Sequence, residues 1–320
     1  MIEARGLART FQTRTGPVEA VRGVDFHVAA GEIVGFLGPN GAGKTTTQRM
    51  LSTLLSPTAG TAIVAGCDLR KDPVGVRRQI GYVAQGGATN PMATVDEELV
   101  TQARLYGMTR HAAEARAKVL RTELDLPDLG QRQAGKLSGG QRRRLDIALG
   151  LMHTPTLVFL DEPSTGLDPH SRANLWTHIR GLRDRERATV FLTTHYLDEA
   201  DALCDRILII DHGTIVAHGT PAELKRRISG EVVTLTIEGD GEKARDLVAA
   251  QAGVRDAQLA GNVVRATVDH GDAAALALMR LLDGADILVA ALSVAHPTLD
   301  DVFLTMTGRS LRDADAPGGN

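Results

Sequence analysis

The stretch Gly38-Pro39-Asn40-Gly41-Ala42-Gly43-Lys44-Thr45 decides the fold of this 320-residue chain. It fits the pattern GxxxxGK[ST] and lies between an apolar run at 32–36 and a helix predicted to extend to about residue 55. Glycines in this pattern let backbone N–H groups turn inward around phosphate oxygens, at the positive end of the helix. The stretch therefore predicts a phosphate-binding loop between a strand and a helix.

Two side chains of this loop are predicted to bind the nucleotide and its metal ion. Lys44 is predicted to reach the β- and γ-phosphates of a nucleotide, and the Thr45 hydroxyl is predicted to coordinate Mg²⁺. The alternative is a glycine-rich turn that binds nothing, and both the spacing and the context disfavour it. The residues expected to contact the nucleotide here are Gly38, Pro39, Asn40, Gly41, Ala42, Gly43, Lys44, Thr45 and Thr46.

A second apolar run ends in two neighbouring carboxylates. Leu157-Val158-Phe159-Leu160 is typical of a buried strand, and Asp161 and Glu162 follow it directly. A parallel sheet would deliver both carboxylates to the nucleotide. We predict that Asp161 holds the magnesium shell, directly or through water, and that Glu162 polarises the attacking water as general base. In the alternative interpretation the two acids are merely solvated.

The segment Leu137-Ser138-Gly139-Gly140-Gln141 precedes these carboxylates and predicts another helix start. Ser138 and Gln141 form an S-x-x-Q capping box, and such a helix end attracts anions. Because the phosphate loop already supplies one cradle, we expect this end to cap the γ-phosphate of ATP bound to another subunit. The run Arg142-Arg143-Arg144 behind it is interpreted as a solvated helix face rather than as phosphate ligands.

With these motifs, residues 1 to about 228 resemble the ATP-binding cassette (ABC) family, whose signature is LSGGQ. The resemblance implies that Phe11 stacks on adenine, that Gln85 senses magnesium and water, and that His195 contacts the γ-phosphate. Taken singly, each of these three residues could equally be structural. The implied catalytic residues are Glu162, His195, Gln85 and Lys44, and the implied magnesium site is Thr45, Gln85 and Asp161. The implied nucleotide contacts beyond the phosphate loop are Phe11, Ser138, Gly139, Gly140, Gln141 and Asp168.

The fold class implied is α/β, a P-loop NTPase cassette with a RecA-like core. The cassette is expected over 1–228, with a helical subdomain over about 86–150. Strands are predicted at 21–28, 32–36, 157–160, 189–193 and 206–211, and a capping box at Thr94 predicts a helix to about Tyr106.

A small α+β domain is expected over 229–310. Its strands are predicted at 232–237, 256–259, 263–268 and 287–292, and its helices at 242–252, 272–282 and 298–306. The order βαββαβ plus a helix predicts a ferredoxin-like fold. We expect this domain either to stabilise a pair of cassettes or their contact with a partner, or to be a passive appendage. The tail 311–320 is predicted to be disordered.

Two further stretches of sequence indicate a subgroup within the ABC family. Thr194 to Asp201 and Pro297 to Leu304 resemble the daunorubicin-resistance-type exporter subunits. The resemblance implies a homodimer that sandwiches two ATP molecules and drives a separate integral-membrane permease, docked near Gln85 and residues 86–100. Its cargo would be an antibiotic or another hydrophobic compound. The alternatives are lipid, glycan or peptide cargo, a cassette that acts away from membranes, or a binding module without hydrolysis.

Composition limits the other classes of function. The net charge of −3 and the pI near 6.4 disfavour a nucleic-acid partner. Two distant cysteines, Cys67 and Cys204, are typical of a reduced cytosolic protein. The apolar stretch 287–295 is about half the ~20 residues that a spanning helix needs. We therefore expect a peripheral protein at the cytoplasmic face of the membrane.

Overall fold

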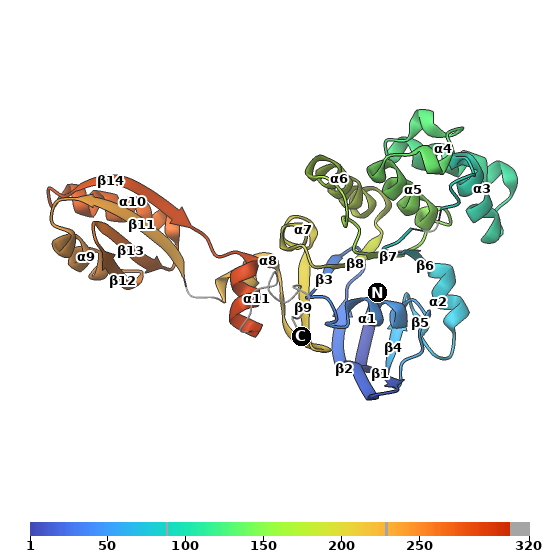
Figure 1. The fold of residues 1–320 in the computed structure, drawn as a ribbon, viewed down its shortest axis with the longest axis horizontal. Coiled ribbons are helices and arrows are strands. Elements are labelled where there is room, and N and C mark those ends of the chain that lie inside the picture. Colours follow the sequence, from blue (N-terminus) through green and yellow to red (C-terminus); the bar gives the residue numbers. More distant parts are fainter. Residues whose placement is uncertain (88, 228–229, 308–320) are drawn as a thin grey trace. The chain divides into compact units, whose positions relative to one another are not determined.

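The computed structural model describes residues 1–87, 89–227 and 230–307, so the predicted tail 311–320 lies outside the described residues. The described chain divides into two compact units, residues 1–221 and 222–307 (Figure 1). Each unit has its own buried apolar cluster, and each is described below by itself.

A six-stranded sheet forms the centre of the first unit, in the order β10-β9-β3-β8-β7-β6. Five of its strands run parallel and β10 is antiparallel to β9. Every residue of β3 and β7 is buried, as expected of a parallel sheet that is covered on both faces. The strands are β3 (Ile33–Leu37), β6 (Ile80–Val83), β7 (Leu157–Asp161), β8 (Thr189–Thr194), β9 (Arg206–Asp211) and β10 (Thr214–Gly219).

A second, antiparallel sheet has the order β2-β1-β4-β5. Its strands are β1 (Ile2–Thr13), β2 (Gly16–Val28), β4 (Ala59–Val64) and β5 (Cys67–Asp68). The sequence predictions named only the second half of β2 and missed the other three strands. The rings of Phe26, Phe36 and Phe191 join the two sheets, with centroids 5.6–6.0 Å apart. Helix α1 (Lys44–Leu51) ends before the predicted residue 55, because Thr53 has the left-handed φ of 65°.

The remaining helices of this unit confirm both predicted capping boxes. Thr94 caps α3 (Val95–Leu105) and Ser138 caps α5 (Gly139–Leu151), each with the reciprocal pair of hydrogen bonds. Figure 1 shows α3, α4 and α5 grouped beyond β6 and β7. The other helices are α2 (Pro73–Gln79), α4 (Arg110–Glu123), the 3₁₀ turns η1 (Pro127–Leu129) and η2 (Ala134–Lys136), α6 (Pro169–Glu186) and α7 (Leu197–Leu203). Helix α8 (Pro221–Arg226) begins at the last residue of this unit and lies otherwise in the second.

The second unit contains one four-stranded antiparallel sheet in the order β12-β13-β11-β14. Helices α9 and α10 pack on one face of it, and the side chains of Val233, Leu235 and Ile237 fill the core between the layers. The element order βαββαβ plus a helix matches the predicted order. The elements are β11 (Glu231–Glu238), α9 (Gly241–Ala249), β12 (Val254–Ala260), β13 (Val263–Val268), α10 (Gly271–Asp283), β14 (Leu288–Ala295) and α11 (Leu299–Thr307).

Candidate nucleotide site

The phosphate loop, residues 38–45, follows β3 and requires glycine at two closely packed positions. Gly43 has φ 107°, and a Cβ atom there would lie 2.5 Å from the backbone oxygen of Ala20. A Cβ atom at Gly38 would lie 2.3 Å from the backbone oxygen of Ile210. Both distances are far below van der Waals contact, so only glycine lets the loop pack against its neighbouring strands.

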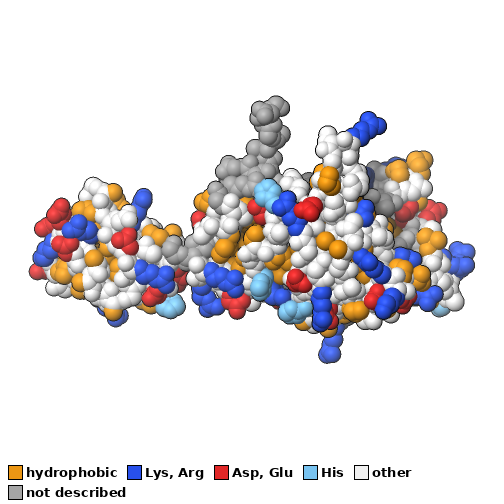
Figure 2. All heavy atoms as spheres, turned by 90° about the horizontal axis from the view of Figure 1, so that it is seen from below, with side chains coloured by type: hydrophobic (Ala, Val, Ile, Leu, Met, Phe, Trp, Pro, Cys, Tyr) orange, Lys and Arg blue, Asp and Glu red, His pale blue; other side chains and the backbone are white. Residues whose placement is uncertain are grey.

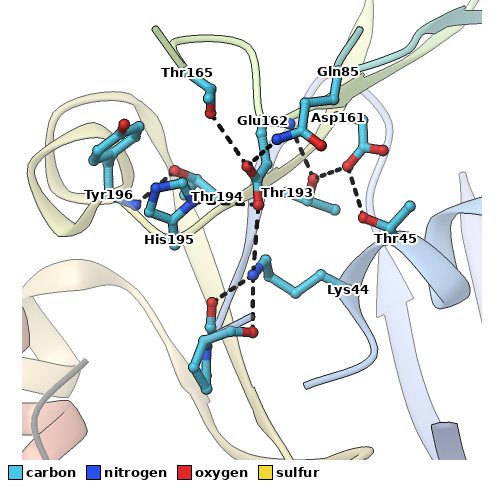
Figure 3. Close-up of polar contacts among 12 residues, drawn as sticks. Lys44, Thr45, Gln85, Asp161, Glu162, Thr165, Thr193, Thr194, His195 and Tyr196 are labelled. Atoms are coloured by element: carbon cyan, nitrogen blue, oxygen red, sulfur yellow. Dashed lines mark hydrogen bonds and ion pairs between the residues drawn. The ribbon is translucent and has the colours of Figure 1, made fainter. Parts of the chain in front are cut away.

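Lys44 is the first residue of α1, and its ammonium group is almost fully buried. Its Nζ donates hydrogen bonds to the backbone oxygens of Gly38 at 2.6 Å and Pro39 at 3.0 Å. The same atom lies 3.7 Å from Oε1 of Glu162. The loop therefore holds a positive charge among oxygen atoms, directly beside the carboxylate that the sequence nominated as general base (Figure 3).

Asp161 and Thr45 meet although they are far apart in sequence. The Thr45 hydroxyl donates to Oδ1 of Asp161 at 3.2 Å, and the Thr193 hydroxyl donates to the same oxygen at 2.6 Å. The contact arises because β3, β7 and β8 are parallel, so their carboxyl ends share one edge of the sheet. The two residues predicted to hold magnesium thus bring a hydroxyl and a carboxylate to one point.

Glu162 stands at the centre of the site in a left-handed backbone conformation, with φ 44°. Such a conformation costs a residue with a side chain about 1–2 kcal/mol. It is held by the Glu162 N–H, which donates to the backbone oxygen of Thr193 at 3.1 Å and to its hydroxyl oxygen at 3.2 Å. Because of this turn, the side chains of Glu162 and Asp161 point in different directions, and their carboxylates contact different residues.

The side chain of Glu162 contacts groups from three further segments. Gln85 Nε2 donates to Oε2 at 2.8 Å, the Thr165 hydroxyl donates to Oε2 at 3.2 Å, and His195 Nδ1 lies 3.3 Å from Oε1 (Figure 3). Burial alone would raise the pKa of Glu162. The contacts with His195 and Lys44 outweigh burial and hold the pKa below its ordinary value. Glu162 is therefore an ionised acceptor at neutral pH.

Arg143 corrects the interpretation of the arginine run as a solvated face. Its side chain is 7% exposed, and it donates to the backbone oxygens of Ala84 at 2.6 Å, Asp161 at 2.9 Å and Pro163 at 2.9 Å. One guanidinium thereby ties the end of β6 to the segment that carries both carboxylates. The helical spacing to the buried Ile147 and Gly150 could have revealed this position, because residues four and seven apart share a helix face.

Glu199 is a second buried group that the sequence predictions missed. It is the third residue of α7, and Oε1 accepts hydrogen bonds from the hydroxyl of Ser164 and from Trp176 Nε1. Burial raises the pKa of Glu199, although these hydrogen bonds act in the opposite direction. This carboxyl links the loop 164–168 to the helix that follows His195. Glu199 lies four residues before the buried Leu203 and so shares its helix face, and this spacing could have indicated that Glu199 is buried.

Several predicted nucleotide contacts stand apart from this network. Ser138 and Gln141 hydrogen-bond to each other, at 3.0 and 3.3 Å. Asp168 caps α6 and accepts hydrogen bonds from Ser171. A Cβ atom at Gly140 would lie 3.0 Å from the Ser171 hydroxyl, so the starts of α5 and α6 adjoin. Phe11 is half-buried on β1, with the Arg9 guanidinium over its ring.

Comparisons with known proteins decide the family. Residues 21–165 match the model of the ABC transporter family, and residues 219–307 match the C-terminal domain of DrrA1-3-like ATP-binding proteins. The daunorubicin/doxorubicin resistance ATP-binding protein DrrA of Streptomyces peucetius is 42% identical over 317 residues, which covers 98% of this chain and 94% of that protein. The chain belongs to the ABC transporter ATP-binding subunits.

Other similarities of this ABC subunit agree with its fold. The Nod factor export ATP-binding protein I of Burkholderia lata is 36% identical over 308 residues, with 95% of this chain and 97% of that protein covered. The dimeric structure of the bacterial ABC transporter cassette MJ0796 superposes with a TM-score of 0.63 at 24% identity, over 69% of this chain and 98% of that chain. The predicted α/β cassette fold and the assignment as an ATP-binding, ATP-hydrolysing protein are thus confirmed.

The surface of this ABC subunit mixes charged and apolar side chains. Figure 2 shows Lys and Arg interspersed with Asp and Glu over both units on the face drawn. Within residues 1–87, 89–227 and 230–307, every helix is too short or too polar to cross a bilayer.

Proposed function

We propose that this chain is the ATPase subunit of an exporter and that Glu162 is the general base of its hydrolysis. The observation that carries the proposal is the position of this carboxylate, which lies among Lys44, Gln85 and His195. A general base must be ionised before it can accept the proton of water, and the low pKa of Glu162 meets that condition. In this proposal Lys44 binds the phosphates, Gln85 orients the water and His195 contacts the γ-phosphate.

Thr45, Asp161 and Gln85 are proposed to hold Mg²⁺. Hydroxyl, carboxylate and amide oxygens are the hard donors that this ion prefers, and Thr45 and Asp161 already meet at 3.2 Å. The ion would neutralise negative charge on the phosphates. The protein itself holds these oxygens in position, because Thr193 and Arg143 donate hydrogen bonds to Asp161.

The second half of each nucleotide site is proposed to come from another copy of the chain. Ser138, Gly139 and Gly140 form a helix start whose described hydrogen bonds stay within α5 and its cap. Uncommitted N–H groups at such an end suit the γ-phosphate of a nucleotide held by a partner. Asp168, at the adjoining start of α6, would lie at the same interface. Phe11 would stack on the adenine.

The cassette, residues 1–228 with a helical subdomain at about 86–150, is proposed to dock on a separate permease at the cytoplasmic face of the membrane. A hollow of about 170 Å³ is lined by Leu54, Tyr82 and Tyr106 together with polar residues such as Arg77 and Gln102. Leu54 and Met92 are largely exposed on the same unit. These exposed apolar side chains are proposed to contact a helix at the cytoplasmic end of the permease. Residues 229–310 are proposed to form an accessory domain.

The cargo is proposed to be a hydrophobic antibiotic, on the strength of 42% identity along nearly the whole chain to a daunorubicin/doxorubicin resistance protein. The test is to express the chain together with its partner permease, identified by copurification, in a drug-sensitive host. We expect lower doxorubicin accumulation, lost in Glu162→Gln. Unchanged accumulation together with normal ATPase activity would redirect the search to lipid, glycan or peptide cargo, because a Nod factor export ATP-binding protein is also similar.

A further inference from the structure

Tyr196 follows His195 directly, and the rings of these two residues are in contact. Their centroids lie 4.1 Å apart at an interplanar angle of 40° (Figure 3). The Tyr196 N–H donates to the Thr194 hydroxyl oxygen at 2.9 Å, which ties down the backbone after β8. Among the described residues the Tyr196 hydroxyl makes no hydrogen bond, although the side chain is half-buried. What Tyr196 offers its neighbours is therefore its aromatic ring.

Arg172 contacts the same ring from α6. Its guanidinium carbon lies over the Tyr196 ring, 4.4 Å from the centroid, which is a cation–π contact. The Arg172 side chain is 21% exposed, and its Nε atom is buried without a hydrogen-bond partner in the described part of the chain. One terminal nitrogen lies 3.2 Å from Oδ2 of Asp198, whose side chain is 59% exposed. The tyrosine ring is thus the partner of the more buried part of this guanidinium.

We propose that Arg172 is a positioning residue for ATP hydrolysis, which holds the Tyr196 ring against His195. The inference rests on the proposed function, in which His195 contacts the γ-phosphate. The imidazole is 20% exposed, and its described polar contact joins Nδ1 to Oε1 of Glu162 at 3.3 Å. One such contact leaves the ring free to turn about its side-chain bonds, whereas packing against a second ring restricts that motion. A restricted imidazole spends more time in the orientation that meets the γ-phosphate.

The position of Arg172 on a regular helix suits it to this role. His195 and Tyr196 form the two-residue connection between β8 and α7. Arg172 lies in the first turn of α6, where its backbone N–H donates to the Asp168 oxygen at 2.9 Å. Side chains supported from helices are placed more precisely than side chains on loops. The cation–π contact thus gives a short connection the support of a helix.

The experiment measures the ATPase kinetics of the full chain together with its copurified permease. Arg172→Met should lower kcat about three- to thirty-fold, the range of one cation–π contact, and leave KM for ATP within about two-fold. Arg172→Lys should recover most of kcat, because a cation remains for the ring. Tyr196→Leu should lose at least as much as Arg172→Met, and adding Arg172→Met to it should cost nothing more, because Arg172 acts through the ring. Asp198→Asn is the matched control, since it removes the ion pair and keeps the guanidinium over the ring.

A measurement on the histidine itself separates positioning from a general effect on the fold. In full chain labelled with ¹³C-histidine, the His195 Cε1–H resonance is identified by its absence in His195→Gln. Arg172→Met should shift or broaden this resonance, and Asp198→Asn should leave it unchanged. Wild-type kcat in Arg172→Met, an equal loss in Asp198→Asn or an unmoved His195 resonance would overturn the inference. Full activity of His195→Gln would instead contradict the proposed role of His195, on which the inference rests.

Discussion

Replacing Arg143 by methionine should destabilise the cassette and disable the site, although the equivalent change at Arg142 should do neither. Arg143 is buried and donates to four backbone oxygens, those of Ala84, Gln85, Asp161 and Pro163. Arg142 is exposed and makes one contact, with the backbone oxygen of Gly135 at 3.3 Å. Methionine keeps most of the apolar stem at both positions. The comparison therefore isolates the guanidinium in two neighbouring residues of one helix.

The magnitude follows from the oxygens left without a donor. The buried carbonyl groups of Asp161 and Pro163 lose these hydrogen bonds, and each loss costs about 1.5–2.5 kcal/mol, in the middle of measured desolvation penalties. The half-buried carbonyl of Ala84 still accepts from the Gly87 N–H at 3.4 Å. The expected loss is about 3–5 kcal/mol, which is a large part of the 5–15 kcal/mol that stabilises a typical domain. Arg142→Met should stay within about 0.5 kcal/mol, as most surface substitutions do. The loss in free energy of unfolding for Arg143→Lys should lie between these two values, because one ammonium group cannot reach the carbonyl groups of two segments at once.

Urea unfolding followed by tryptophan fluorescence measures this difference in the first unit alone. The chain has one tryptophan, Trp176, whose Nε1 donates to Glu199 and Ser164. With an m-value of about 2–3 kcal/mol/M, Arg143→Met should lower the midpoint by about 1–2 M. Its ATPase rate should also fall under fully folded conditions, since Gln85 and Asp161 lose their common anchor. Equal midpoints for the two methionine variants would refute the reasoning.

Three further changes test the site. Glu162→Gln should bind ATP as a stable dimer and lose at least ~100-fold in turnover, the scale of general-base catalysis, as gel filtration and phosphate release can show; unchanged release would contradict the assignment. Lys44→Ala should abolish binding of a labelled ATP analogue in equilibrium titration, with the exposed Lys118→Ala as a control. Glu199→Gln should gain stability over wild type as pH rises above about 4.5. Burial raises the folded-state pKa of Glu199, so its contribution is fully present below the unfolded pKa and is lost as pH rises through the folded pKa. A difference in unfolding midpoint between Glu199→Gln and wild type that is the same at pH 4.5 and at pH 8 would argue against that shift.

The sequence was most informative where a local pattern dictates local structure. The capping boxes at Thr94 and Ser138 placed two helix starts correctly, because four consecutive residues contain the whole motif. The buried strands β3, β7 and β8 were also found, since strands of a covered parallel sheet are buried along their whole length and contain short apolar runs. The shared edge of these strands brings the predicted catalytic residues together, as expected of a parallel sheet. The distances between the segments could not be predicted, because no local pattern contains them.

The missed features depend on contacts between distant segments. Strand β1 alternates buried and exposed residues irregularly over Ile2–Thr13, and its pairing with β2 and β4 has bulges, so no clean period marks it. Arg143 was misjudged because a charged side chain is seldom buried, and the four carbonyl oxygens that accept its hydrogen bonds come from distant segments. Glu199 escaped for the same reason.

The contacts of Glu162 also couple substrate binding to the strength of the base. In the structure its pKa is held down by His195 and by Lys44, whose ammonium lies 3.7 Å away. A triphosphate bound at Lys44 engages that ammonium and brings negative charge to the same pocket, and both effects raise the pKa of a neighbouring carboxylate. A general base becomes stronger as its pKa rises toward the working pH. For the general base proposed above, the loss of the Lys44 contact on phosphate binding would strengthen Glu162, while a bound Mg²⁺ would act in the opposite direction.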